Sequence, residues 1–109
     1  MLSAPSLALP PAAAADRARS EETPLEHRAA LERFLAEVER RAFRMAQLAV
    51  GDADAALDIV QDAMIRLARR YADRPAEEWR PLFFRILANR ITDHQRRGSV
   101  RRRVIAWLA

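Results

Sequence analysis

The sequence contains no cysteine and no lysine, and it has only two glycines and two histidines among its 109 residues. Without cysteine the chain forms neither disulfides nor thiolate metal sites, so it needs no oxidising compartment, which fits a cytoplasmic protein. The histidines, His27 and His94, lack ligand-like spacing, and no glycine-rich phosphate loop is present. We therefore expect no enzymatic activity, no metal and no cofactor.

Long apolar runs are also missing. Prolines interrupt the apolar residues near the N-terminus and no basic segment precedes them, so we predict neither a signal peptide nor a stable membrane insertion. Residues 1–24 mix Ala, Pro, Ser and charge without a sustained period, and they bury too little apolar surface to offset their ordering entropy. We predict a flexible tail here and one small folded domain over residues 25–109.

Ala, Leu, Arg and Glu dominate the sequence while β-branched residues are few, which predicts an all-α fold, a compact bundle of three to four helices. A first helix is expected over residues 25–49, with apolar residues recurring every three or four positions: Leu31, Phe34, Leu35, Val38, Ala42, Met45, Leu48 and Ala49. Gly51 should end it, and Asp52 should cap a second helix that runs to about Tyr71.

The second helix shows one main apolar stripe, which we expect to face the core: Leu57, Val60, Met64, Leu67, Ala68 and Tyr71. This leaves Ile59 and Ile65 beside Asp62 and Arg66 on another side. Exposed isoleucines next to charges are typical of a helix that docks against a helix of another protein. The alternative is a packing surface for a further helix of this chain.

A third helix should start near Trp79, with Pro81 in its first turn, and end near Arg97. Its expected core residues are Trp79, Leu82, Phe83, Ile86, Leu87 and Ile91. Gly98 and Ser99 should break the helix, and residues 101–108 should restart as a short basic helix. Because this restart ends one residue before the end of the sequence, it favours a truncation inside a longer protein, with a natural end as the alternative.

The charge is strongly polarised along the chain. Residues 1–78 hold 11 arginines and 14 acids, net −3, whereas residues 79–109 hold eight arginines and one acid, net +7. A basic segment after an acidic body indicates two partners, of which one is a polyanion. A face of solvated arginines without a partner is the other interpretation.

Helical spacing places Arg85, Asn89, Thr92 and Arg96 on the side opposite Phe83. Gln95 and Arg97 lie one face over. Arginines at this spacing can follow phosphates, while Asn and Gln can contact base edges. The expected loop after Gly98 could enclose an unstacked base.

Two motifs at this spacing, DIVQDAMIRLARR at residues 58–70 and PLFFRILANRITDHQRR at residues 81–97, resemble region 2 of bacterial sigma-70 family sigma factors. The resemblance is closest to the small extracytoplasmic-function (ECF) group and covers roughly residues 25–109. It implies a domain that docks on the clamp helices of the RNA polymerase β′ subunit, and that recognises and melts the promoter −10 element, contacting its non-template strand. An anti-sigma factor is a further partner that the resemblance suggests.

The resemblance and the helical faces together assign roles to residues. The second helix would supply the polymerase-binding side chains, namely Asp58, Ile59, Gln61, Asp62, Ile65 and Arg66, supported by Val60, Met64 and Leu67. The third helix and the following loop would supply the DNA-binding residues, namely Arg85, Asn89, Thr92, Asp93, Arg96, Arg97, Gly98, Ser99, Val100, Arg101, Arg102 and Arg103. The loop would hold one flipped base.

Two departures from the family pattern are visible. Ala68 and Leu82 stand where aromatic residues are common in the family, and Trp79, one turn earlier, is the expected substitute for the second of these. A domain resembling region 4, which reads the −35 element, has no counterpart in this sequence. The alternative functions are a helical adaptor whose basic, tryptophan-bearing C-terminus lies on an anionic membrane surface, and a generic duplex DNA-binding protein.

Overall fold

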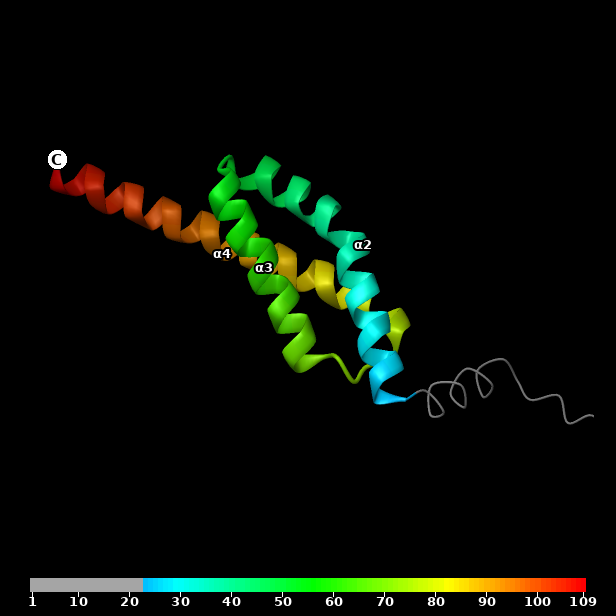
Figure 1. Cartoon of the computed structure of the whole chain (residues 1–109). Helices are drawn as coiled ribbons and strands as arrows, with labels where there is room; N and C mark the ends of the chain where they lie inside the picture. Colours follow the sequence, from blue (N-terminus) through cyan, green and yellow to red (C-terminus); the bar gives the residue numbers. More distant parts are fainter. Residues whose placement is uncertain (1–22) are drawn as a thin grey trace, which may run out of the picture.

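The structure of the protein is a computed structural model that describes residues 23–109. Three helices make up this part of the protein: α2 (Pro24–Val50), α3 (Ala53–Arg70) and α4 (Ala76–Leu108). A tight turn joins α2 to α3, and α4 crosses both helices (Figure 1). The all-α prediction is confirmed for the described residues, with three helices and not four. The flexible tail was predicted for residues 1–24, and residues 1–22 of it lie outside the described part.

The ends of the first two helices follow from local capping. Thr23 and Glu26 form a capping box, in which Thr23 Oγ1 accepts the backbone N–H of Glu26 at 3.0 Å and Glu26 Oε2 accepts that of Thr23 at 3.2 Å. Gly51 ends α2 with a positive φ of 72°, which a residue without Cβ adopts readily. Asp52 Oδ1 then accepts the Asp54 N–H at 2.9 Å and starts α3. The predicted turn and cap are confirmed.

The start of α4 differs from the prediction by about one turn. The helix begins at Ala76, so Pro81 lies inside it and not in the first turn. Two acidic residues, Glu77 and Glu78, occupy the first turn, where their negative charges interact favourably with the positive end of the helix dipole and stabilise the helix start. The indole Nε1 of Trp79 donates to the Tyr71 carbonyl at 3.1 Å and holds this first turn against the end of α3.

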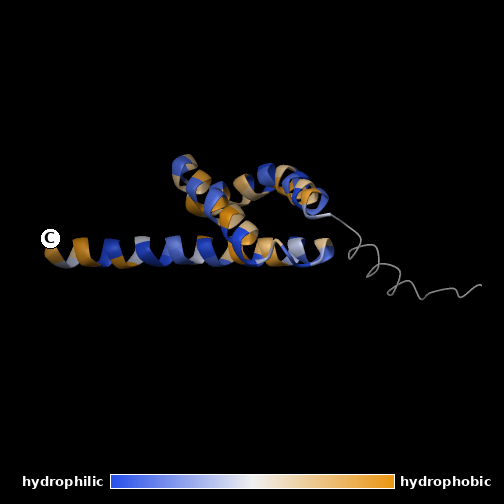
Figure 2. Cartoon of the chain, turned by 60° about the horizontal axis from the view of Figure 1, so that its bottom comes forward, coloured by the Kyte–Doolittle hydropathy of each residue, from blue (hydrophilic) through white to orange (hydrophobic). Residues whose placement is uncertain are grey.

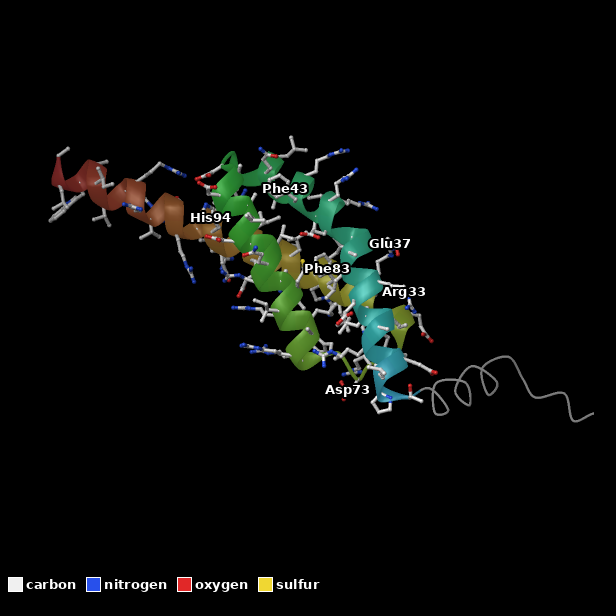
Figure 3. The ribbon with its side chains drawn as sticks, viewed as in Figure 1. Arg33, Glu37, Phe43, Asp73, Phe83 and His94 are labelled. Atoms are coloured by element: carbon white, nitrogen blue, oxygen red, sulfur yellow. The ribbon has the colours of Figure 1, made fainter. Side chains whose placement is uncertain are left out.

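All three helices contribute to one core. The buried residues are Leu31, Val38, Ala42 and Ala46 from α2, Ala56, Ile59, Val60, Ala63 and Leu67 from α3, and Trp79, Phe83 and Leu87 from α4. Four of these are alanines with no exposed surface, so α2 and α3 pack with little side-chain bulk between them. Phe83 lies between the helices, edge-on to Phe34 with 6.2 Å between the ring centroids (Figure 3).

Several predicted core positions are wrong. Ile59, expected on the outside, is only 3% exposed, whereas Leu57, expected inside, is 42% exposed. On α2, Met45 and Leu48 are exposed although the apolar period included them. The reason on α3 is that the buried stripe runs through Ala56 and Ala63, which lie one residue before the larger Leu57 and Met64.

The break predicted at Gly98 and Ser99 is also wrong, because both residues lie within α4, which continues to Leu108. A single glycine costs a helix interior only about 1 kcal/mol. No proline follows Pro81, and arginine, the commonest residue after His94, is a good helix former. The result is one helix whose C-terminal part projects beyond α2 and α3 (Figures 1 and 2).

Replacing Phe83 by alanine tests the core. Phe83 has no exposed surface, so its truncation should lower the free energy of unfolding by about 3–5 kcal/mol. Urea unfolding followed by circular dichroism measures this loss. Leu48→Ala is the matched control, because Leu48 is 83% exposed and its truncation should change the free energy by less than about 0.5 kcal/mol. Equal effects of the two substitutions would contradict the assigned core.

Candidate functional site

One face of α4 carries a row of polar and basic side chains. Arg85, Asn89, Thr92 and Arg96 follow one another at intervals of four, three and four residues, opposite the buried Phe83 and Leu87, and all four are exposed. Because α4 does not break, Ser99 and Arg103 continue the same spacing. We call these six residues, Arg85, Asn89, Thr92, Arg96, Ser99 and Arg103, the arginine row. The eighteen helical steps from Arg85 to Arg103 give it a length of about 27 Å.

The remaining predicted DNA-binding residues are spread around α4. Arg97, Val100, Arg101 and Arg102 are exposed, but they point in different directions because successive helical residues are about 100° apart. No loop forms over residues 98–103, so the prediction of a base-holding loop there is wrong. Gln95 is also engaged elsewhere, since its Nε2 donates to the Ala49 carbonyl at 3.2 Å and ties α4 to the end of α2.

A cavity of about 170 Å³ lies between α3 and α4. Its lining residues are Arg66, Arg70 and Tyr71 from the end of α3, and Leu82, Arg85, Ile86 and Asn89 from α4. Three of these are arginines and none is acidic, while Tyr71, Leu82 and Ile86 supply apolar walls. Arg85 and Asn89 also belong to the arginine row, so the cavity adjoins one end of it. We call this space the arginine cavity.

Sequence reasoning missed this cavity. Tyr71, Leu82 and Ile86 had been assigned to the core, and the structure keeps them only half-buried. Arg70 had no assigned role. The one signal in the sequence was the placement of Arg66 on one predicted helix and Arg85 on the next, and it could not show that the two helices bring these side chains together.

The outer face of α3 carries three residues of the predicted polymerase-binding set, Asp58, Gln61 and Ile65. All three are exposed, Ile65 to 48%. Ile59 does not join them, because its side chain belongs to the core. The predicted pair of exposed isoleucines is therefore a single exposed isoleucine between polar neighbours. We call these three residues, Asp58, Gln61 and Ile65, the α3 outer face.

Asp62 and Arg66, the other two predicted polymerase-binding residues, belong to a chain of ion pairs between α3 and α4. The Oδ2 atom of Asp62 lies 3.0 Å from Arg66 Nε and 2.7 Å from Arg90 Nε. Arg90 Nη1 lies 3.7 Å from Asp93 Oδ2. Neither Asp62 Oδ2 nor Arg90 Nε has hydrogen-bond geometry with any described group, so the contact is an ion pair at close distance. The side chain of Arg90 is 18% exposed and that of Asp62 is 36% exposed.

Asp93 thus contacts Arg90, while its neighbour His94 is exposed near the point where α4 leaves the bundle (Figure 3).

A second ion pair between helices joins Arg80 of α4 to Glu37 of α2 at 2.9 Å. None of the described helices has both the length and the apolar composition needed to cross a membrane.

A helical domain with an exposed basic row on one helix and a mixed acidic and apolar face on another can join a protein partner to a nucleic acid. The family model described as Sigma-70 region 2 matches residues 30–102, which are 73 of the 109 residues, and the chain belongs to this family. No curated protein and no solved structure matched the chain.

Sigma factors of this family are non-enzymatic proteins that act with RNA polymerase on promoter DNA in transcription initiation. The resemblance to sigma-70 region 2 stated from the sequence is therefore confirmed. The narrower placement in the ECF group stays a prediction.

The continuity of α4, on which the length of the arginine row depends, can be tested at Gly98. A Cβ at this position would meet only the end of the Arg102 side chain, at 3.4 Å. Gly98→Ala should therefore stabilise the projecting part of α4 by about 0.5–1 kcal/mol. Amide hydrogen exchange of residues 99–103 should slow by about two- to fivefold.

The control for this measurement is Gly51→Ala. Gly51 has a φ of 72°, and a side chain in this conformation should destabilise the domain by about 1 kcal/mol. If Gly98→Ala left the exchange rates unchanged or raised them, residues 98–103 would not form a helix in solution.

Proposed function

We propose that this domain docks on the β′ clamp helices of RNA polymerase through α3 and binds the non-template strand of the promoter −10 element through α4. The observation that carries the proposal is the arrangement of α4. Its buried side chains, Trp79, Phe83 and Leu87, turn the arginine row outward, and the arginine cavity connects this row to the end of α3. One rigid unit therefore offers both surfaces.

On the DNA side, the arginine row supplies guanidinium groups that have no carboxylate partner among the described residues, namely those of Arg85, Arg96 and Arg103. Arginine suits phosphate groups because its planar fork donates several hydrogen bonds. Asn89 lies between Arg85 and Arg96 and can both donate to and accept from a base edge. These side chains support contact with a strand whose backbone follows α4.

The arginine cavity supports the binding of one extruded base. Its apolar walls, Leu82 and Ile86, suit the face of a base, while Arg66, Arg70 and Arg85 at its sides suit the adjoining phosphates. This replaces the loop at Gly98 as the candidate base site. An extruded base in the cavity would leave Arg96 and Arg103 for the neighbouring backbone.

On the polymerase side, the α3 outer face supplies one exposed apolar residue, Ile65, between Asp58 and Gln61. These side chains form no ion pair or hydrogen bond with other described side chains, so they are free to contact a partner helix. A helix that presents an isoleucine with polar groups around it suits helix-on-helix docking, in which the apolar contact gives affinity and the charges give orientation.

Charge reversal at Asp58 tests the docking surface. Asp58→Arg should weaken binding to the isolated β′ clamp helices by about tenfold, which corresponds to about 1.4 kcal/mol, because an exposed acidic contact becomes repulsive. Calorimetry or a pull-down with the clamp fragment measures the change. Asp73→Arg, at an exposed position in the loop after α3, is the control with the same change in charge. Absence of wild-type binding at low salt would refute the docking proposal.

Removal of two arginines from the row tests the DNA surface. Arg85→Ala combined with Arg96→Ala should reduce the salt dependence of binding to a single-stranded −10 oligonucleotide, lowering the slope of log K against log salt by about 1.4 if both side chains contact phosphates. Fluorescence anisotropy at several salt concentrations gives this slope. Arg33→Ala, on the exposed surface of α2, should lower the slope far less.

Two other functions make different predictions in these assays. A generic DNA-binding protein would prefer duplex to single-stranded DNA. A membrane-surface adaptor gains support from the exposed apolar residues at the end of α4, among them Trp107 at 83% and Leu108 at 70% exposure. Binding to anionic vesicles without any binding to the clamp fragment would favour that adaptor.

A further inference from the structure

Asp62 lies beside the arginine cavity, although it is not one of the residues that line it. The cavity walls hold three arginines and no carboxylate. Asp62 contacts one of these three, Arg66, at 3.0 Å, and it also contacts Arg90 from α4 at 2.7 Å. Asp62 is therefore an acidic residue of the domain itself that contacts one of the arginines lining this basic site.

The two acids at the centre of α3 differ in their surroundings. Asp58 is exposed and forms no ion pair with a described residue. Asp62, one turn later, shares a single oxygen between two guanidinium groups. The arginines of the cavity also differ in whether they have a charged partner. Arg66 forms an ion pair with Asp62, while Arg70 and Arg85 have no carboxylate partner among the described residues.

We propose that Asp62 is a positioning residue that restrains anion binding in the arginine cavity, by holding Arg66 and Arg90 in ion pairs for which a DNA phosphate must compete. This inference rests on the proposed function, since it takes the ligand of the cavity to be a nucleotide of single-stranded DNA. It gives Asp62 a role in addition to the polymerase contact that the sequence predicts for it.

The restraint follows from charge balance along the ion-pair chain. Asp62, Arg66, Arg90 and Asp93 carry two negative and two positive charges, so the chain as a whole is neutral. A phosphate that approaches Arg66 must displace or share its contact with Asp62. Because Asp62 and Arg66 are 36% and 44% exposed, water screens this competition, and the effect on affinity should be a few-fold.

The decisive substitution is Asp62→Asn, which keeps the size of the side chain and removes its charge. We expect the affinity of the full chain for a single-stranded −10 oligonucleotide at low salt to rise about three- to fivefold. A substitution that only damaged the fold would lower the affinity, so a gain identifies the restraint. Glu39→Gln on α2, an exposed acid without an ion pair among the described residues, has the same change in charge and should raise the affinity less than about twofold.

The role of Arg66 is tested by the double variant Asp62→Asn with Arg66→Ala, in which the gain should disappear. A second measurement does not depend on the folding of Asp62→Asn. In the chain with Asp62 present, Arg66→Ala should weaken oligonucleotide binding less than Arg70→Ala does, because Arg66 is already held by a carboxylate. Circular dichroism and the urea midpoint confirm that each variant is folded.

The outcomes separate the two proposals. If the wild-type chain binds the oligonucleotide but Asp62→Asn binds no better than Glu39→Gln, or Arg66→Ala weakens binding as much as Arg70→Ala does, the restraint by Asp62 is wrong and the proposed function stands. If the wild-type chain binds no single-stranded DNA even at low salt, the proposed function itself fails on the DNA side.

Discussion

The burial of Trp79, Phe83 and Leu87 is the constraint on which the rest of the structure depends. These residues recur every four positions, so they fix the rotation of α4 about its own axis against α2 and α3. Once that rotation is fixed, Arg85 and Asn89 can only face away from the core. The chemistry offered to a nucleic acid is thus set by apolar packing on the opposite side of the same helix.

Much of the fold could be predicted because its signals are local. Gly51 and Asp52 each act on backbone groups within a few residues, and signals of this kind can be recognised in a sequence. The apolar stripe of α3 was harder to assign, because its position depends on two small residues, Ala56 and Ala63, that the predicted stripe left out. Ala56 and Ala63 define the buried side, since close approach of α2 needs small residues there, and this turns Ile59 inward and Leu57 outward.

The candidate site was only partly predictable for a related reason. The spacing of the arginine row is a property of one helix, so the sequence was enough to find its first four members. The arginine cavity and the contacts of Asp62 depend on how α3 and α4 cross, which no local pattern contains. The break predicted at Gly98 was wrong for a different reason. A glycine ends a helix only where the residues after it cannot continue the helix, and the arginines after Gly98 are good helix formers.

The scarcity of carboxylates around the arginine row bears on whether it binds a partner. Elsewhere in the described structure some arginines have acidic partners one turn away, as in Arg28 with Glu32 and Arg74 with Glu78, while others such as Arg70 have none. Asp93 is the one acid in residues 79–109, and Arg90 occupies it from outside the row. The arginines of the row therefore have no compensating carboxylate among the described residues, and anions that are not part of the described helices can reduce the repulsion between them. A surface that needed only solubility would gain more from mixed charges, so the missing carboxylates favour a polyanion as its partner.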